Sequence, residues 1–158
     1  MRLGHVLAWL AMGLAPMAAH AERDPGRAIA ELFATQMDAD RDGVLEDGEV
    51  IAFSEAVFSS MDIDGSGGLT FEEMRDWEHG MADLATFRHR EEAFDASIGM
   101  AFALFDRDRD GLISPAEYKA GVRIAAGLAD GDKNGTLTVN EYLDGFIFNV
   151  AMRTALAG

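Results

Sequence analysis

The sequence contains no cysteine and few basic residues. Without cysteine the chain can carry neither a disulfide framework nor a lipoprotein anchor. Its 13 Lys and Arg residues stand against 28 Asp and Glu residues, which gives a formal net charge of −15 at pH 7. A chain this acidic has no basic stripe that could neutralise phosphates, so we exclude a nucleic-acid partner.

Histidine is also scarce, because only His79 and His89 occur beyond residue 21. Neither has a nucleophile or a recognisable set of metal ligands beside it in the sequence. No glycine-rich loop of the kind that holds a phosphate is present either. We therefore predict that the protein is not an enzyme and has no catalytic residues.

Long hydrophobic runs are absent except near the amino terminus. Residues 1–21 contain no acidic residue, begin with the basic Arg2 and hold a largely apolar run from Val6 to Ala18. This run is shorter than the ~20 residues that span a bilayer, and small residues precede a cleavage point after Ala21. The pattern predicts a signal peptide over 1–21, a periplasmic or secreted protein, and no stable membrane insertion after cleavage. An uncleaved anchor, a buried helix and a cut two residues earlier are the alternatives.

The acidic residues follow a spacing that is clearest in Asp106–Glu117, which has the sequence DRDRDGLISPAE. Carboxylates occupy positions 1, 3, 5 and 12, a glycine occupies position 6 and an apolar residue position 8. Alternate residues of a tight loop can direct three short carboxylates at one point, and glycine tolerates the turn that this requires. Such a loop suits a hard cation that takes six to eight oxygen ligands, as calcium does.

The same pattern occurs three more times, although the oxygen-bearing residue at position 5 is Ser66 in loop two and Asn134 in loop four. We number the loops in chain order: loop one is Asp38–Glu49 (DADRDGVLEDGE), loop two Asp62–Glu73 (DIDGSGGLTFEE), loop three Asp106–Glu117, and loop four Asp130–Glu141 (DGDKNGTLTVNE). Acidic surface turns would not repeat an apolar residue at position 8 and a glutamate at position 12 four times. All four loops resemble the calcium loops of the EF-hand family, as in calmodulin. The resemblance implies an all-α EF-hand fold and up to four bound Ca²⁺ ions.

The resemblance also implies six calcium ligands in each loop, at positions 1, 3, 5, 7, 9 and 12. Position 7 would contribute its backbone carbonyl, position 9 would act directly or through water, and position 12 would contribute both carboxylate oxygens. The expected metal ligands are Asp38, Asp40, Asp42, Val44, Glu46 and Glu49 in loop one; Asp62, Asp64, Ser66, Gly68, Thr70 and Glu73 in loop two; Asp106, Asp108, Asp110, Leu112, Ser114 and Glu117 in loop three; and Asp130, Asp132, Asn134, Thr136, Thr138 and Glu141 in loop four.

The loops form an internal repeat. Loops one and three start 68 residues apart, and so do loops two and four. This indicates a tandem duplication of a helix–loop–helix–loop–helix unit. We place the first pair of loops in residues 22–90 and the second in residues 91–158, and expect residues 22–158 to form one compact domain.

Only 12 residues separate the two loops of each pair, 50–61 and 118–129. This spacing is closer than in calmodulin and is similar to that of secreted or periplasmic bacterial EF-hand proteins. Apolar residues recur in both segments at helical intervals, which predicts one helix that leaves one loop and enters the next. Such a helix would be about 18 Å long and would hold its two loops apart. Loop two could then pair with loop three and loop one with loop four; two short helices with a bend are the alternative.

Outside the loops, Asp24 and Pro25 are typical of a helix start, and this helix should run to Met37. A helical face continues from Met74 to Leu84, and a second helix leads into loop three. Between these two helices, the charged residues 88–92 indicate a solvated bend rather than a binding patch. A last helix from Tyr142 past Val150 would close the chain.

We expect a calcium-responsive sensor or modulator that acts on an unidentified protein target. A calcium buffer or a constitutively loaded structural or interaction module is the alternative. The methionines and phenylalanines beside the loops favour an ordinary core over a regulated groove. Loops one and three, with the most carboxylates, should bind most tightly, and loop two most weakly. Repulsion among the acids of empty loops should couple calcium binding to folding.

Overall fold

The computed structural model describes residues 24–77 and 81–157. The predicted signal peptide, His79 and the last residue lie outside these ranges. Within them, no helix is both long enough and apolar enough to cross a membrane.

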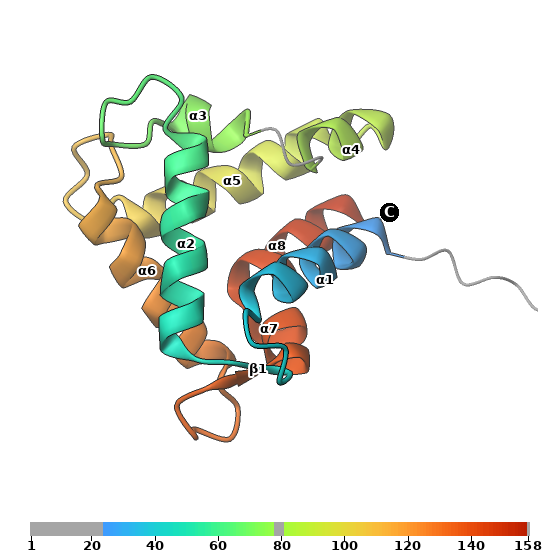
Figure 1. Cartoon of the computed structure of the whole chain (residues 1–158). Helices are drawn as coiled ribbons and strands as arrows, with labels where there is room; N and C mark the ends of the chain where they lie inside the picture. Colours follow the sequence, from blue (N-terminus) through green and yellow to red (C-terminus); the bar gives the residue numbers. More distant parts are fainter. Residues whose placement is uncertain (1–23, 78–80, 158) are drawn as a thin grey trace, which may run out of the picture.

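The chain folds into helices that repeat the same order in its two halves (Figure 1). The all-α fold is therefore confirmed. The first half contains α1 (Pro25–Met37), the short strand β1 (Val44–Leu45), α2 (Asp47–Met61) and α3 (Phe71–Arg75); α4 (Met81–Phe87) connects it to α5 (Glu91–Phe105), α6 (Pro115–Ala129), the strand β2 (Leu137–Thr138) and α7 (Val139–Gly145), and α8 (Ile147–Leu156) closes the chain.

The long helices α2 and α6 are each continuous from one loop to the next, which confirms the single-helix prediction. With 15 residues each, they are about 22 Å long and hold their loops at opposite ends. Loops two and three lie together at one end of the two helices, and loops one and four at the other (Figure 1).

Short antiparallel pairings join the loops across the two halves. Leu45 of loop one pairs with Leu137 of loop four in the β1–β2 sheet. Leu69 of loop two and Ile113 of loop three exchange two backbone N–H···O hydrogen bonds, each 2.9 Å long. The pairing of loop one with four and of two with three is thus confirmed, and it follows from the length of α2 and α6.

The interior is shared between the halves. The apolar residues at position 8 of the four loops are at most 2% exposed and belong to one core cluster. In the same cluster, the Phe58 ring of α2 meets the Tyr118 ring of α6 edge-on, with centroids 5.4 Å apart. A smaller cluster fills the space between α4, α5 and α8 and contains Phe94, Met152 and Leu156. Since neither half encloses its apolar residues alone, the halves depend on each other for stability.

Two helix predictions are wrong. The helical face from Met74 to Leu84 is interrupted, because α3 ends at Arg75 and Trp77 leaves the helix. The Trp77 ring lies 5.7 Å from that of Phe33, and its indole N–H donates to the Ser60 hydroxyl at 2.9 Å. These tertiary contacts override the helical periodicity of the local sequence.

The closing segment is likewise two helices, because Phe146 is extended between α7 and α8. A Cβ built on Gly145 would lie 2.9 Å from the Cα of Ala129, so the end of α7 packs against the backbone of α6. The side-chain amide of Asn149 donates to the Tyr142 carbonyl at 3.0 Å, which satisfies a backbone group at the break.

The charged residues 88–92 do form a bend, since α4 ends at Phe87 and α5 begins at Glu91. Two of them also hold the end of α8. Arg88 donates to the Leu156 carbonyl at 3.2 Å, and Arg90 to the Ala155 carbonyl at 3.0 Å. These carbonyls are among those that a helix leaves without an internal partner.

The substitution Gly121→Ala should destabilise the fold, because a Cβ at this buried position of α6 would lie 2.0 Å from the Phe105 ring. Overpacking of this kind costs about 1–3 kcal/mol. The matched control is Gly127→Ala in the same helix, where a Cβ would meet nothing within 4 Å. This control should stabilise by up to ~1 kcal/mol through helix propensity. Denaturant unfolding of both variants tests the packing, and equal shifts in the two would contradict it.

Candidate metal sites

The four loops share one backbone conformation. Positions 4 and 6 of every loop have a positive φ, as at Arg109 (62°) and Gly111 (91°) in loop three. Glycine at position 6 was expected for this reason. The left-handed residue at position 4 was not, because Arg41, Arg109 and Lys133 bear side chains that disfavour it.

Three carboxylates converge in each loop. The acids at positions 1, 3 and 12 place one oxygen each so that all three lie within 4.8 Å of one another. The four clusters are Asp38, Asp40 and Glu49; Asp62, Asp64 and Glu73; Asp106, Asp108 and Glu117; and Asp130, Asp132 and Glu141. The structure thus brings together three of the six predicted ligands of every loop.

Peptide N–H groups hold the position-1 aspartate in the same way throughout. In loop three, Asp106 accepts from the Asp110 N–H at 3.1 Å and from the Gly111 N–H at 3.1 Å, one bond to each carboxylate oxygen. Loops one, two and four repeat this pair of hydrogen bonds. The backbone therefore orients the carboxylate and offsets part of the repulsion from its neighbours.

The position-12 glutamate joins the start of its loop to the helix that follows. Glu117 accepts from the Arg107 N–H at 2.9 Å and from the Ser114 N–H at 3.0 Å. Hydrogen bonds from the Ser114 N–H and hydroxyl, supplemented by the N–H groups of Arg107 and Asp108, lower the pKa of the Glu117 carboxyl to about 2. Equivalent hydrogen bonds lower the pKa of Glu73 and of Glu141. These acids are ionised at neutral pH, as metal binding requires.

Position 9 is the N-cap of the helix that leaves each loop. The Thr70, Ser114 and Thr138 hydroxyl oxygens accept from the N–H of the glutamate three residues later, which in turn accepts from the position-9 N–H. This is a capping box. The capping box was not predicted, although Thr or Ser followed three residues later by Glu is its signature in a sequence. A role of position 9 in metal binding stays a prediction.

Position 5 lies outside the close carboxylate clusters. Asp42, Asp110 and Asn134 each accept from the position-7 N–H at 2.8 Å, which leaves further lone pairs free for an ion. Loop two differs, because the Ser66 hydroxyl donates to the Gly68 carbonyl at 2.9 Å. The two oxygens expected from positions 5 and 7 are therefore bonded to each other in this loop.

Loop one carries an additional acid. A hydrogen bond between the Glu46 and Glu49 carboxyl groups raises the pKa of Glu46 and lowers that of Glu49. Two carboxylates this close hold a proton between them more readily than either does alone.

Comparison with known proteins bears on two of the loops. A protein-family model described as EF hand matches residues 55–76 and 100–122, which contain loops two and three. These two segments are EF hands of the calcium-binding family. No curated protein and no solved structure matches the chain. Loops one and four have the same backbone conformation and hydrogen bonds as the two matched EF hands.

The donor set of each EF hand fits calcium. Carboxylate, hydroxyl, amide and carbonyl oxygens are available, and no sulfur or imidazole belongs to the clusters found among the described residues. Hard oxygen donors in a loop of this size suit calcium better than zinc or copper, which prefer nitrogen and sulfur. These four groups could each hold one ion.

Removal of one loop's glutamate should affect its partner loop across the halves. Glu49→Gln should weaken calcium binding in loop one by about tenfold or more, because a charged ligand is lost. It should also weaken loop four through β1–β2, and affect loops two and three least. Glu73→Gln is the matched variant, with loop three as the partner. The N–H signals of Gly43, Gly67, Gly111 and Gly135 report each site in an NMR titration. A larger effect of Glu49→Gln on loop two than on loop four would contradict this coupling.

The calcium-free protein should lose stability in acid. The folded pKa of Glu117, about 2, lies below its ordinary value of 4.5. Its contribution to stability is therefore present above about 4.5 and is lost as the pH falls towards 2. Helical circular dichroism followed from neutral pH into acid should show this loss. Glu117→Gln cannot titrate and should have a shallower acid transition; an unchanged slope would mean that these hydrogen bonds do not act in solution.

Proposed function

We propose that the protein is an extracytoplasmic calcium sensor or modulator, in which occupancy of the EF-hand loops controls the packing of the helices. The observation that carries this proposal is a single apolar cavity lined by residues from all of the helices α1 to α8. Six of these helices, all except α4 and α8, directly enter or leave a loop. A change in any loop would therefore reach the same interior.

Repulsion between the loop carboxylates would allow calcium binding to change how the helices pack. Each loop concentrates at least three carboxylates, and the whole chain has a net charge of −15. Calcium would neutralise repulsion at both ends of α2 and α6, where the loop pairs join the halves. We infer that binding tightens these junctions and stabilises the shared core.

We propose the location outside the cytoplasm from the sequence of residues 1–21, which has the composition of a signal peptide. Calcium is often plentiful in such compartments. A sensor there needs sites of micromolar to millimolar affinity, because submicromolar sites would remain filled.

A constitutively loaded structural module is the second candidate, and one observation favours it. The carboxylates at positions 1 and 12 already accept peptide N–H groups in every loop. Loops held in shape by these bonds would change little when calcium binds.

A calcium titration of the chelator-stripped chain without residues 1–21 separates the two candidates. Trp77 is then the only tryptophan, and its contacts with Phe33 and Ser60 make it sensitive to the packing of α1 and α2. A sensor should show micromolar to millimolar sites by calorimetry and a large change in Trp77 emission. Each independent site at a hundredfold excess of calcium over Kd should add about 2.7 kcal/mol to the free energy of unfolding. Submicromolar sites with constant emission would favour the loaded module, and fewer than two sites would overturn both.

A further inference from the structure

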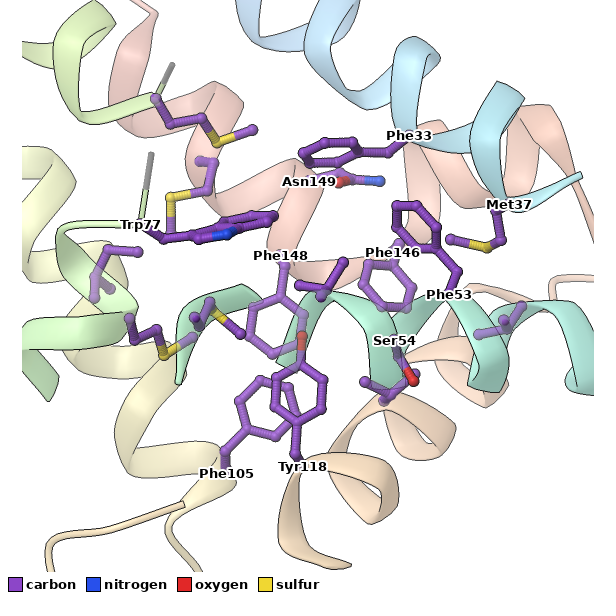
Figure 2. Close-up of a pocket in the computed structure, with 18 of the residues that line it drawn as sticks. Phe33, Met37, Phe53, Ser54, Trp77, Phe105, Tyr118, Phe146, Phe148 and Asn149 are labelled. Atoms are coloured by element: carbon purple, nitrogen blue, oxygen red, sulfur yellow. The ribbon is translucent and has the colours of Figure 1, made fainter. Parts of the chain in front are cut away.

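The apolar cavity has a volume of about 150 Å³. Aromatic rings surround it, with Phe33 and Trp77 on one side, Phe105 and Tyr118 on the other, and Phe148 between them (Figure 2). A dry apolar cavity of ~150 Å³ in a protein can accommodate one benzene ring. The space is therefore sufficient for one aromatic ring and too small for a long acyl chain.

Most polar groups in the cavity wall have partners within the protein. The Ser54 hydroxyl donates to the Ile51 carbonyl at 2.8 Å, and the Asn149 side chain donates to the Tyr142 carbonyl at 3.0 Å. Arg75 is held by Asp95 at 2.9 Å and by Asp76 at 2.7 Å. These groups complete the fold and offer no free charge to a ligand.

The Tyr118 hydroxyl differs from these polar groups because it lacks a partner in the part of the chain that the structure describes. The side chain of Tyr118 is among the core residues at 9% exposure, and its hydroxyl has no hydrogen-bond partner among the described residues. No fully buried side-chain oxygen or nitrogen in the described residues lacks a partner, so this hydroxyl must retain some accessible surface. Figure 2 shows it directed towards the middle of the cavity, beside the Phe148 ring. A phenylalanine would fill the same space without a polar group that lacks a partner in the protein.

The surroundings define the charge of a suitable ligand. An anion would meet no free cation in the wall and would be repelled by a chain of net charge −15. A cation would need open aromatic faces. The Phe105 ring is instead stacked on the Tyr118 ring and on the Phe148 ring, with centroids 5.0 Å and 4.7 Å apart. A cation would also lose its hydration in this apolar interior without a free anion to pair with. The cavity therefore suits an uncharged ligand better than an anion or a cation.

We propose that this cavity binds a small, uncharged, single-ring aromatic molecule that carries one hydrogen-bonding group, such as a phenol. The ring would occupy the apolar space, and the polar group would pair with the Tyr118 hydroxyl. This ligand site goes beyond the proposed calcium sensing, although it lies in the same cavity.

The test uses the calcium-loaded chain with phenol as the probe and toluene as its apolar counterpart, measured by calorimetry and ligand-observed NMR. The protein should bind phenol in the millimolar range or more tightly, and about fivefold better than toluene, as one neutral hydrogen bond provides. Tyr118→Phe should lose this preference while still binding toluene. It should also unfold at a higher temperature without ligand, because the unpaired hydroxyl is gone.

Tyr142→Phe is the control, since it removes a second buried tyrosine hydroxyl from the same wall. It should retain the preference for phenol over toluene. Equal loss of the preference in both variants would overturn the proposed role of Tyr118. Absence of phenol binding to the unmodified chain would overturn the site itself. If N-acetyl-tryptophan amide bound where phenol did not, the cavity would be an anchor pocket for a partner's side chain, and the small-molecule proposal would be wrong.

Discussion

The rigidity of α2 and α6 is the constraint on which the rest of the structure depends. Each helix carries a loop at both ends, so the two loops that one helix connects cannot touch. The position-8 residues must instead find partners in the other half of the chain, as Leu45 does with Leu137 and Leu69 with Ile113. Every loop pair therefore joins the two halves, and the core between them forms as a consequence.

The position-12 glutamates connect this architecture with the chemistry of the loops. Each accepts N–H groups from the start of its loop and from the helix cap that follows, as Glu117 does from Arg107 and Ser114. A charge-assisted hydrogen bond is roughly twice as strong as a neutral one. These bonds make a densely acidic loop tolerable, and they place the glutamate where movement of its carboxylate would be transmitted to the first turn of the next helix.

Local spacing explains which features could be predicted from the sequence. The four loops, the helices α2 and α6 and the exchange of loop partners depend on positions a few residues apart, and all were predictable. The breaks at Trp77 and Phe146 depend on contacts with distant residues, Phe33 and Ala129, which no local pattern reveals. The convergence of positions 1, 3 and 12 was predictable for the same local reason as the loops. The unpaired Tyr118 hydroxyl was not, because its surroundings come from several helices.

The exchange of loop partners has the symmetry of a twofold dimer. Loop one corresponds to loop three and loop two to loop four, so the two contacts are the same contact made twice in opposite directions. An isologous interface between identical subunits has this form. Here the connection through α4 places both copies in one polypeptide, and their effective concentration is fixed by the linker rather than by the amount of protein present. Assembly of the two halves is thus independent of dilution, which a separate half-length subunit could not achieve.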